Sequence, residues 1–146
     1  MIVTFYDIGT VADDKLKFAV IIAKYKGEWI FVQHKERNTW EIPGGRREVD
    51  EAIEDTAKRE LYEETGAVSF DLKPLCCYSV KRVNREESYG ALFYAEVKGM
   101  GQIPVESEIR KITLLKEMPI ELTYPEIQPL LHERALKMLG IRDNQK

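Results

Sequence analysis

Apolar runs along the first two thirds of the chain predict several strands. Residues 18–23 (FAVIIA) are continuously apolar, which is typical of a strand covered on both faces. Gly27 separates this run from a second apolar segment at 29–33, so we expect a hairpin. Two further β-rich runs, 76–83 and 88–97, flank the polar turn 84–87, and another short strand is expected near 109–115.

A helical period replaces these patterns in two places. Apolar residues recur four apart at Ile53, Ala57 and Leu61, which predicts an amphipathic helix. The helix is expected to end at Gly66, because glycine tolerates the left-handed backbone of a helix C-terminus. A second helix is predicted to run through 130–139 to Gly140. The segment 123–126 (TYPE) has the spacing of a capping box, although Pro129 would allow this helix to begin only there. One helix among the strands and one near the end predict an α/β fold, with a mixed sheet between helices.

Composition fits a single domain spanning residues 1–146. The chain is 44% hydrophobic, which is enough for one core, and it contains no linker-like stretch. The net charge of −3 argues against a broad nucleic-acid footprint, although a small nucleotide needs only local charge. The N-terminus does not resemble a secretory signal and no run is long enough to span a membrane, so we expect a cytoplasmic protein. Cys76 and Cys77 are adjacent and are expected to be reduced core thiols.

Candidate chemistry is concentrated in the first predicted helix. Glu60, Glu63 and Glu64 fall within one helical turn and share an arc with the apolar stripe. Like charges at this spacing repel one another, and burial beside Leu61 would raise their pKa values further. A divalent cation would offset both effects, so the pattern predicts a metal site.

The segment 45–67 resembles the Nudix box, Gx5Ex7REUxEExGU, in which U is aliphatic. The matching residues are Gly45, Glu51, Arg59, Glu60, Leu61, Glu63, Glu64, Gly66 and Ala67. Ala67 is small for the last position, and Val68 is expected to supply the missing bulk. Upstream, 40–45 (WEIPGG) is similar to the strand and turn that precede the box in this superfamily. The resemblance implies the Nudix α/β/α sandwich.

The resemblance also implies a metal and its ligands. The cation would be Mg²⁺, or alternatively Mn²⁺, held by the box acids Glu60, Glu63 and Glu64. We expect Gly45 to contribute from the backbone and Glu51 to reach the site from the loop before the helix. A further acid from outside the box often completes such sites, and Glu106 and Glu108 are the candidates.

Other roles follow from residue type. The expected catalytic residues are Glu60, Glu63 and Arg59, and Glu60 is favoured as general base. Arg59 is expected to orient a box carboxylate by a charge-assisted hydrogen bond, with a direct phosphate contact as the alternative. Gly44 and Gly45 are expected to allow positive φ and a close approach of the main chain to metal or phosphate. Aromatic candidates for stacking on a base are Trp40, Tyr78, Tyr89, Phe93 and Tyr94, of which Trp40 and Tyr78 are preferred as substrate-binding residues. Basic candidates for distal phosphates are Lys81, Arg82 and Arg85, whereas His34 and His132 are predicted to be non-functional.

The predicted protein is a Mg²⁺-dependent hydrolase of the small MutT-like kind, a monomer or homodimer. It would convert a purine dNTP, oxidised or not, to a monophosphate and pyrophosphate. The short chain leaves little room for the extra N-terminal domain common in ADP-ribose-cleaving relatives, and 122–129 is similar to 8-oxo-dGTP diphosphatases. Dinucleoside polyphosphates, ADP-ribose and RNA 5′ ends are alternative substrates. A non-catalytic nucleotide-sensing module is another alternative, but such modules usually lose box acids and this chain keeps all of them.

Overall fold

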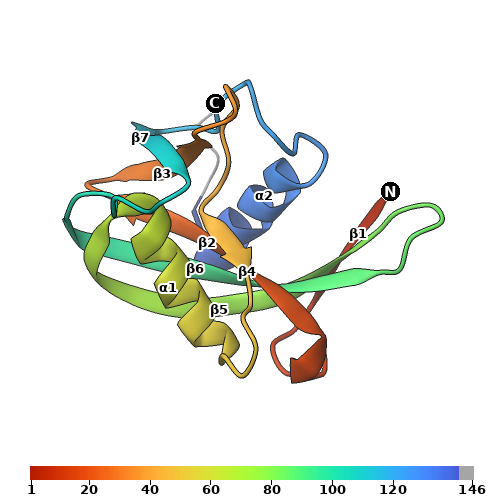
Figure 1. Cartoon of the computed structure of the whole chain (residues 1–146). Coiled ribbons are helices and arrows are strands. Elements are labelled where there is room, and N and C mark those ends of the chain that lie inside the picture. The colour runs from red at the N-terminus through yellow and green to blue at the C-terminus, as the bar shows by residue number, and fades with distance from the viewer. Residues whose placement is uncertain (142–146) are drawn as a thin grey trace.

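One seven-stranded mixed sheet organises the molecule, as the computed structural model of residues 1–141 shows (Figure 1). The strand order is β1-β5-β6-β2-β3-β7, and β4 pairs separately with β2. The β2–β6 pair is parallel and the remaining pairs are antiparallel. The strands are β1 (Ile2–Tyr6), β2 (Leu16–Tyr25), β3 (Glu28–His34), β4 (Gly44–Arg46), β5 (Ala67–Lys81), β6 (Ser88–Met100) and β7 (Ile109–Leu115). A 3-10 helix, η1 (Asp13–Lys15), precedes β2.

Two helices cover opposite faces of this sheet (Figure 1). Ala57 and Leu61 of α1 (Ile53–Thr65) pack into one core cluster, whereas Leu131 and Ala135 of α2 (Gln128–Leu139) pack into the other. The predicted α/β/α sandwich is therefore confirmed.

Strand β2 lies between the two cores and explains the apolar run at 18–23. Ala19 and Ile21 join the cluster beneath α1, whereas Val20 and Ile22 join the cluster beneath α2. Because both faces are buried, the strand shows no alternation of polar and apolar residues. The turn to β3 uses Lys26–Gly27, both with positive φ, as a tight hairpin does.

The structure contains strand segments that the pattern did not predict. Strand β1 pairs with β5 at the edge of the sheet, and its mostly half-buried residues lack a clear alternation. Strand β5 begins at Ala67, just after the Gly66 that ends α1. The pattern did not predict the first half of this strand, because that half is largely exposed and lacks an apolar run. A register shift beside Pro74 accommodates a residue that cannot donate to the ladder. Strand β6 continues to Met100, three residues beyond the predicted end.

The helix ends test the predicted start and stop signals. Gly66 ends α1 in the left-handed region, with its N–H donating to the Tyr62 carbonyl, as predicted. Helix α2 begins at Gln128 with proline in its first turn, but no side chain caps it, so the capping-box prediction is wrong. Ala67 is buried while Val68 is 63% exposed, so Val68 does not supply the bulk expected of it.

Two further expectations concern the thiols and the membrane. Cys76 and Cys77 are free and buried, as predicted, and burial raises the pKa of Cys76 to about 11. Within residues 1–141, neither helix is both long and apolar enough to cross a bilayer.

Candidate active site

The short strand β4 packs against helix α1 through Gly45 and against strand β2 through Gly44. A Cβ atom at Gly45 would lie 2.1 Å from Oε2 of Glu60, and one at Gly44 would lie 2.4 Å from the Ala19 carbonyl oxygen. Neither glycine has positive φ, so that prediction is wrong. The glycines are required because a carboxylate and a neighbouring strand occupy the space where a side chain would begin.

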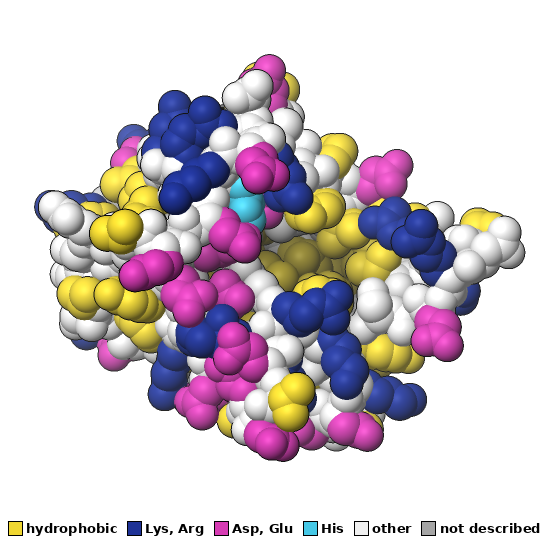
Figure 2. All heavy atoms as spheres, in the orientation of Figure 1, with side chains coloured by type: hydrophobic (Ala, Val, Ile, Leu, Met, Phe, Trp, Pro, Cys, Tyr) yellow, Lys and Arg dark blue, Asp and Glu magenta, His cyan; other side chains and the backbone are white. Residues whose placement is uncertain are grey.

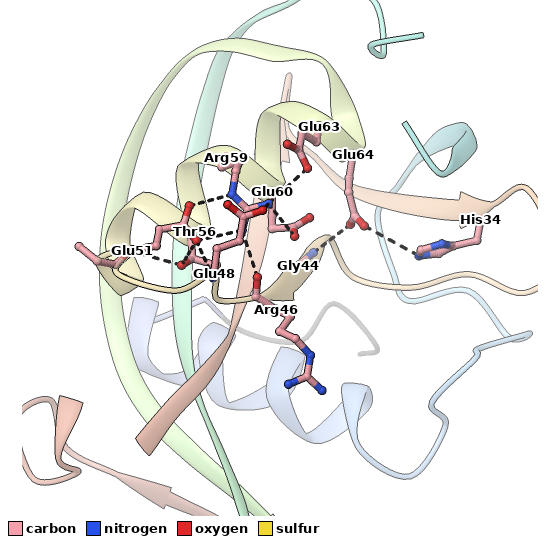
Figure 3. Close-up of polar contacts among 11 residues, drawn as sticks. His34, Gly44, Arg46, Glu48, Glu51, Thr56, Arg59, Glu60, Glu63 and Glu64 are labelled. Atoms are coloured by element: carbon pink, nitrogen blue, oxygen red, sulfur yellow. Dashed lines mark hydrogen bonds and ion pairs between the residues drawn. The ribbon is translucent and has the colours of Figure 1, made fainter. Parts of the chain in front are cut away.

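Of the box acids at this contact, Glu64 is buried and Glu60 is partly buried, with 14% of its side chain exposed (Figure 3). Glu64 is 8% exposed, and its Oε1 accepts a hydrogen bond of 3.0 Å from the Gly44 N–H. Burial raises the pKa of Glu64 to about 8, against the opposing effect of that hydrogen bond. Burial likewise raises the pKa of Glu60 to about 7, while the positive charge of Arg59 acts in the opposite direction. The carboxyl groups of Glu60 and Glu64 therefore both lie where burial disfavours the ionised form.

Arg59 connects the buried acids to the loop before the helix. Its Nε and Nη2 donate to the two oxygens of Glu51 at 2.7 and 2.9 Å, and its Nη1 lies 3.1 Å from Glu60 and 3.4 Å from Glu63. The predicted orientation of a box carboxylate by Arg59 is therefore present. The hydrogen bond to Glu51 is the main reason that the pKa of Arg59 is raised above its ordinary value.

Glu51 reaches the site from outside the helix, as expected, but both of its oxygens are already engaged. In addition to Arg59, the Thr56 hydroxyl donates at 2.7 Å and the Glu48 N–H at 3.1 Å. Arg59 is the main cause that lowers the pKa of Glu51 to about 2. The structure therefore places Glu51 as the anion that fixes Arg59.

Further acids extend the site into a cavity of about 450 Å³. Its lining includes Glu60, Glu63 and Glu64 from α1 and Glu106 and Glu108 from the loop before β7. Glu108 shares this lining with Glu60 and Glu64, and its charge contributes to their raised pKa values. Both acids predicted from outside the box thus lie beside the helix.

The acids that line this cavity, here called the acidic wall, suit a hard divalent cation: Glu60, Glu63, Glu64, Glu106 and Glu108. The donors of this wall are carboxylate oxygens, which Mg²⁺ prefers, and positive charge would offset the cost of ionising Glu60 and Glu64. Within the described residues 1–141, no three acidic, histidine or cysteine side chains converge at ligand spacing. Glu60 and Glu63 instead contact Arg59, and the side chain of Glu63 is 47% exposed, which leaves it room to rotate.

His34 joins the acidic wall, although the sequence analysis predicted no function for it. From the end of β3, its Nε2 lies 3.3 Å from Oε1 of Glu41. The same nitrogen lies 3.8 Å from Oε2 of Glu64 (Figure 3). The other oxygen of Glu41 accepts a 2.6 Å hydrogen bond from Arg37. His132 lies instead among core aromatics, 5.2 Å from Trp29 between ring centroids.

A cleft of about 540 Å³ opens beside the acids. Figure 2 shows a hollow with a hydrophobic floor, acidic side chains on one side and basic side chains on the other. The apolar part of the lining includes Phe18, Val20, Tyr78, Val80, Ile127 and Leu131. On the basic side, the Arg46 guanidinium lies 4.9 Å from the Phe18 ring centroid, and Arg82 and Ser88 extend the cleft to the β5–β6 turn.

Few of the predicted substrate-binding side chains reach this cleft. Tyr78 and Arg82 do, and the backbone of Gly44 and Gly45 also lines it. The Tyr78 ring lies across Gly90, where a Cβ would be 2.6 Å from the ring. The other candidates lie outside the cleft lining: Trp40, Tyr89, Phe93, Tyr94, Lys81 and Arg85. The cleft residues to which the sequence analysis assigned no role include Phe18, His34, Glu41, Arg46 and Gln128, and none of them is a fixed letter of the Nudix box.

Comparison with known proteins places this site in context. The NUDIX domain family matches residues 14–135 of the chain. A protein of Bacillus subtilis (strain 168), whose name provisionally describes an 8-oxo-dGTP diphosphatase, is 31% identical over 111 residues. That match covers 75% of this chain and 68% of the relative.

Solved structures repeat the fold at lower identity. The crystal structure of a mutant of the B. subtilis pyrophosphohydrolase BsRppH superposes with a TM-score of 0.78 at 23% identity, covering 96% of this chain and 93% of the other. The NUDIX domain of Shewanella oneidensis NrtR, complexed with ADP ribose, gives a TM-score of 0.66 at 21% identity, covering 92% and 94%. Both comparisons extend over most of the sheet and the two helices.

Proposed function

The chain belongs to the Nudix hydrolase family, and from this premise we propose that it hydrolyses a purine dNTP, oxidised or not, to a monophosphate and pyrophosphate. One observation carries the proposal: buried acids of α1 meet the Gly44–Gly45 backbone beside a largely apolar cleft of about 540 Å³. This volume lies within the range of roughly 300–1,000 Å³ that is typical of sites for small ligands. The name of the B. subtilis relative supports the same substrate class.

Nudix hydrolases generally use divalent metals, and we propose that Glu60, Glu63 and Glu64 hold Mg²⁺ or Mn²⁺ in this chain. Glu108, which lines the same cavity as these acids, is the candidate from outside the box. A bound cation would neutralise charge on the phosphate oxygens and make a coordinated water easier to deprotonate. The carboxylate oxygens of the acidic wall suit this role.

Side chains around the acids are proposed to carry out proton transfer, positioning and phosphate binding. Glu60 is proposed to take the proton of the attacking water, because its carboxylate is fixed between Gly45 and Arg59 at the cleft. Glu51 is proposed to act through Arg59, since its oxygens are filled by hydrogen bonds. Arg46 and Arg82, on the opposite side, are available to contact substrate phosphates. We further propose that residues 1–146 work as one domain, because both helices pack on the same sheet.

Glu64→Gln tests the metal assignment with little disturbance of packing. A glutamine oxygen can still accept from the Gly44 N–H, so the variant should fold, while the charge needed to hold a cation is lost. We expect kcat to fall by at least about 10²-fold and Mn²⁺ binding, measured by electron paramagnetic resonance, to weaken. Glu54→Gln is the matched control, because Glu54 lies on the same helix but faces solvent and pairs with Lys58. Unchanged turnover and Mn²⁺ affinity in Glu64→Gln would refute the metal assignment.

A substrate panel tests the reaction. It contains dNTPs, oxidised dNTPs, ADP-ribose, dinucleoside polyphosphates and triphosphorylated RNA, each with Mg²⁺ and scored for pyrophosphate and phosphate. Pyrophosphate release from a purine dNTP at a kcat/KM of about 10⁴ M⁻¹s⁻¹ or more supports the proposal. A clear preference for another member assigns that substrate instead. No turnover of any member, with nucleotide binding retained, identifies a sensing module.

A further inference from the structure

The side-chain amide of Gln128, the first residue of α2, has a fixed orientation in the wall of the cleft. Its Oε1 accepts a hydrogen bond of 2.8 Å from the Ile42 N–H. Because a backbone N–H can only donate, the oxygen and not the nitrogen of the amide must face Ile42. The Nε2 group, with two hydrogens to donate, is therefore turned away from Ile42.

The free end of this amide opens to the cleft. Gln128 is 7% exposed and lies in the cleft lining. Among the described residues, Nε2 has no hydrogen-bond acceptor, yet it is not one of the atoms sealed from solvent. The Nε2 group of Gln128, whose orientation is fixed by Ile42, is thus available to donate a hydrogen bond to a ligand bound in the cleft.

The position of Gln128 relative to the acids suits the base of a nucleotide. Gln128 is tied to Ile42 and Glu64 to Gly44, two residues further along the same segment. Two residues of chain span at most about 7 Å, which is of the order of the separation between the phosphate of a nucleotide and its base. The neighbouring lining at this end is apolar, with Ile127 and Leu131 from the same helical region and Tyr78 from the sheet.

From this geometry we infer that Gln128 selects a 6-oxopurine, such as guanine or hypoxanthine, over a 6-aminopurine; the inference rests on the proposed function. Guanine presents two acceptors, O6 and N7, on one edge, whereas adenine presents an amino donor at the position of O6. The amide donor complements the keto oxygen and opposes the amino group. Oxidation of guanine at C8 leaves O6 in place, so the preference includes oxidised guanine nucleotides.

Gln128→Glu tests the inference, because it preserves the contact with Ile42 and changes only the chemistry offered to the ligand. A glutamate oxygen still accepts from the Ile42 N–H, but the second oxygen is an acceptor where the wild-type amide donates. Wild-type protein with Mg²⁺ is expected to prefer GTP and ITP over ATP by at least tenfold in kcat/KM. In Gln128→Glu the ratio of GTP to ATP should fall at least tenfold, mainly through KM.

Controls separate charge and folding from recognition. Gln102→Glu adds the same charge at an exposed position outside the cleft lining and should leave the ratio unchanged. If Gln128→Glu fails to fold, Gln128→Met removes the donor at similar volume and should abolish the preference for GTP and ITP.

Two results would overturn the inference: equal kcat/KM for GTP and ATP in the wild type, or a ratio that Gln128→Glu leaves unmoved. If the wild type releases pyrophosphate from neither these nucleotides nor their 2′-deoxy forms, the proposed function fails on its own. Calorimetric binding of non-hydrolysable GTP and ATP analogues then tests Gln128 separately. Tighter binding of the GTP analogue would support the inference, and equal binding would overturn it.

Discussion

The two glycines of β4 allow the placement of Glu60, the proposed general base, to be tested separately from the stability of the fold. In Gly45→Ala the new methyl group would lie 2.1 Å from Oε2 and 2.2 Å from Cδ of Glu60. In Gly44→Ala it would lie 2.4 Å from the Ala19 carbonyl oxygen and 3.1 Å from the Val20 Cα. The first methyl meets the end of a flexible side chain, whereas the second meets the backbone of a paired strand.

The expected magnitudes follow from what can move. Non-bonded heavy atoms are optimally about 3.5 Å apart, so the Glu60 carboxylate must shift by more than about 1 Å in Gly45→Ala. A displacement of this size can lower turnover about 10²-fold, while the stability should change by no more than about 1 kcal/mol because the side chain yields. Gly44→Ala must instead push β4 from β2, which typically costs about 1–3 kcal/mol. For a chain of 146 residues this lowers Tm by several degrees.

Three measurements on the same preparations check this reasoning. Calorimetry gives Tm, pyrophosphate release from the best substrate gives kcat, and electron paramagnetic resonance gives Mn²⁺ affinity independently of turnover. Gly45→Ala should keep its Tm within about 3 °C and lose kcat, while Gly44→Ala should lose Tm. Wild-type turnover in Gly45→Ala would refute the role of Glu60, and an unchanged Tm in Gly44→Ala would refute the strand contact.

Other predictions concern the pH dependence of stability, the fork of hydrogen bonds from Arg59 to Glu51 and Glu60, the Tyr78 ring in the cleft, and the buried thiols. Because the pKa values of Glu60 and Glu64 are raised to about 7 and 8 from an ordinary 4.5, the folded state binds more protons than the unfolded state between about pH 4.5 and 8. In EDTA, Tm should therefore fall as pH rises through this window, and Mn²⁺ or the double variant Glu60→Gln/Glu64→Gln should flatten the dependence. Arg59→Lys keeps the charge but cannot bridge Glu51 and Glu60 together, so we expect a loss of about 1–3 kcal/mol by urea unfolding and a lower kcat; wild-type values would contradict the fork. Gly90→Ala should push the Tyr78 ring toward the cleft and raise KM more than it lowers kcat, whereas an unchanged KM would place that ring outside the substrate site. Cys76, whose pKa burial raises to about 11, should react with iodoacetamide at pH 8 much more slowly in folded than in urea-unfolded protein, and equal rates would contradict its burial.

Local patterns in the sequence predicted the position and the buried face of helix α1 well. The arc shared by Glu60, Glu64 and Leu61 follows from helical geometry alone, so the burial of Glu64 and the partial burial of Glu60 could be expected. The continuous apolar run of β2 likewise indicated burial on both faces. Such predictions succeed because the residues that determine the structure are neighbours along the chain.

Features that depend on distant pairing could not be predicted in this way. Gln128 meets Ile42 across 86 residues, and His34 meets Glu64 only because β3 ends beside α1. The role of Gly45 was assigned to backbone freedom, whereas its cause is the carboxylate of Glu60, fifteen positions later. The edge strand β1 is fixed by its pairing with β5 and has no distinctive pattern of its own.

The β5–β6 turn provides Arg82 and Ser88 to the cleft, yet it lies away from β4 and from the box acids on α1. The turn can therefore be lengthened or shortened, and its residues exchanged, without moving the glutamates of α1 that are proposed to carry the reaction. Selection can therefore retune the range of accepted substrates at this turn while the chemistry is inherited intact. A library confined to positions 82–87 is accordingly the natural starting point for evolving new substrate preferences on this scaffold.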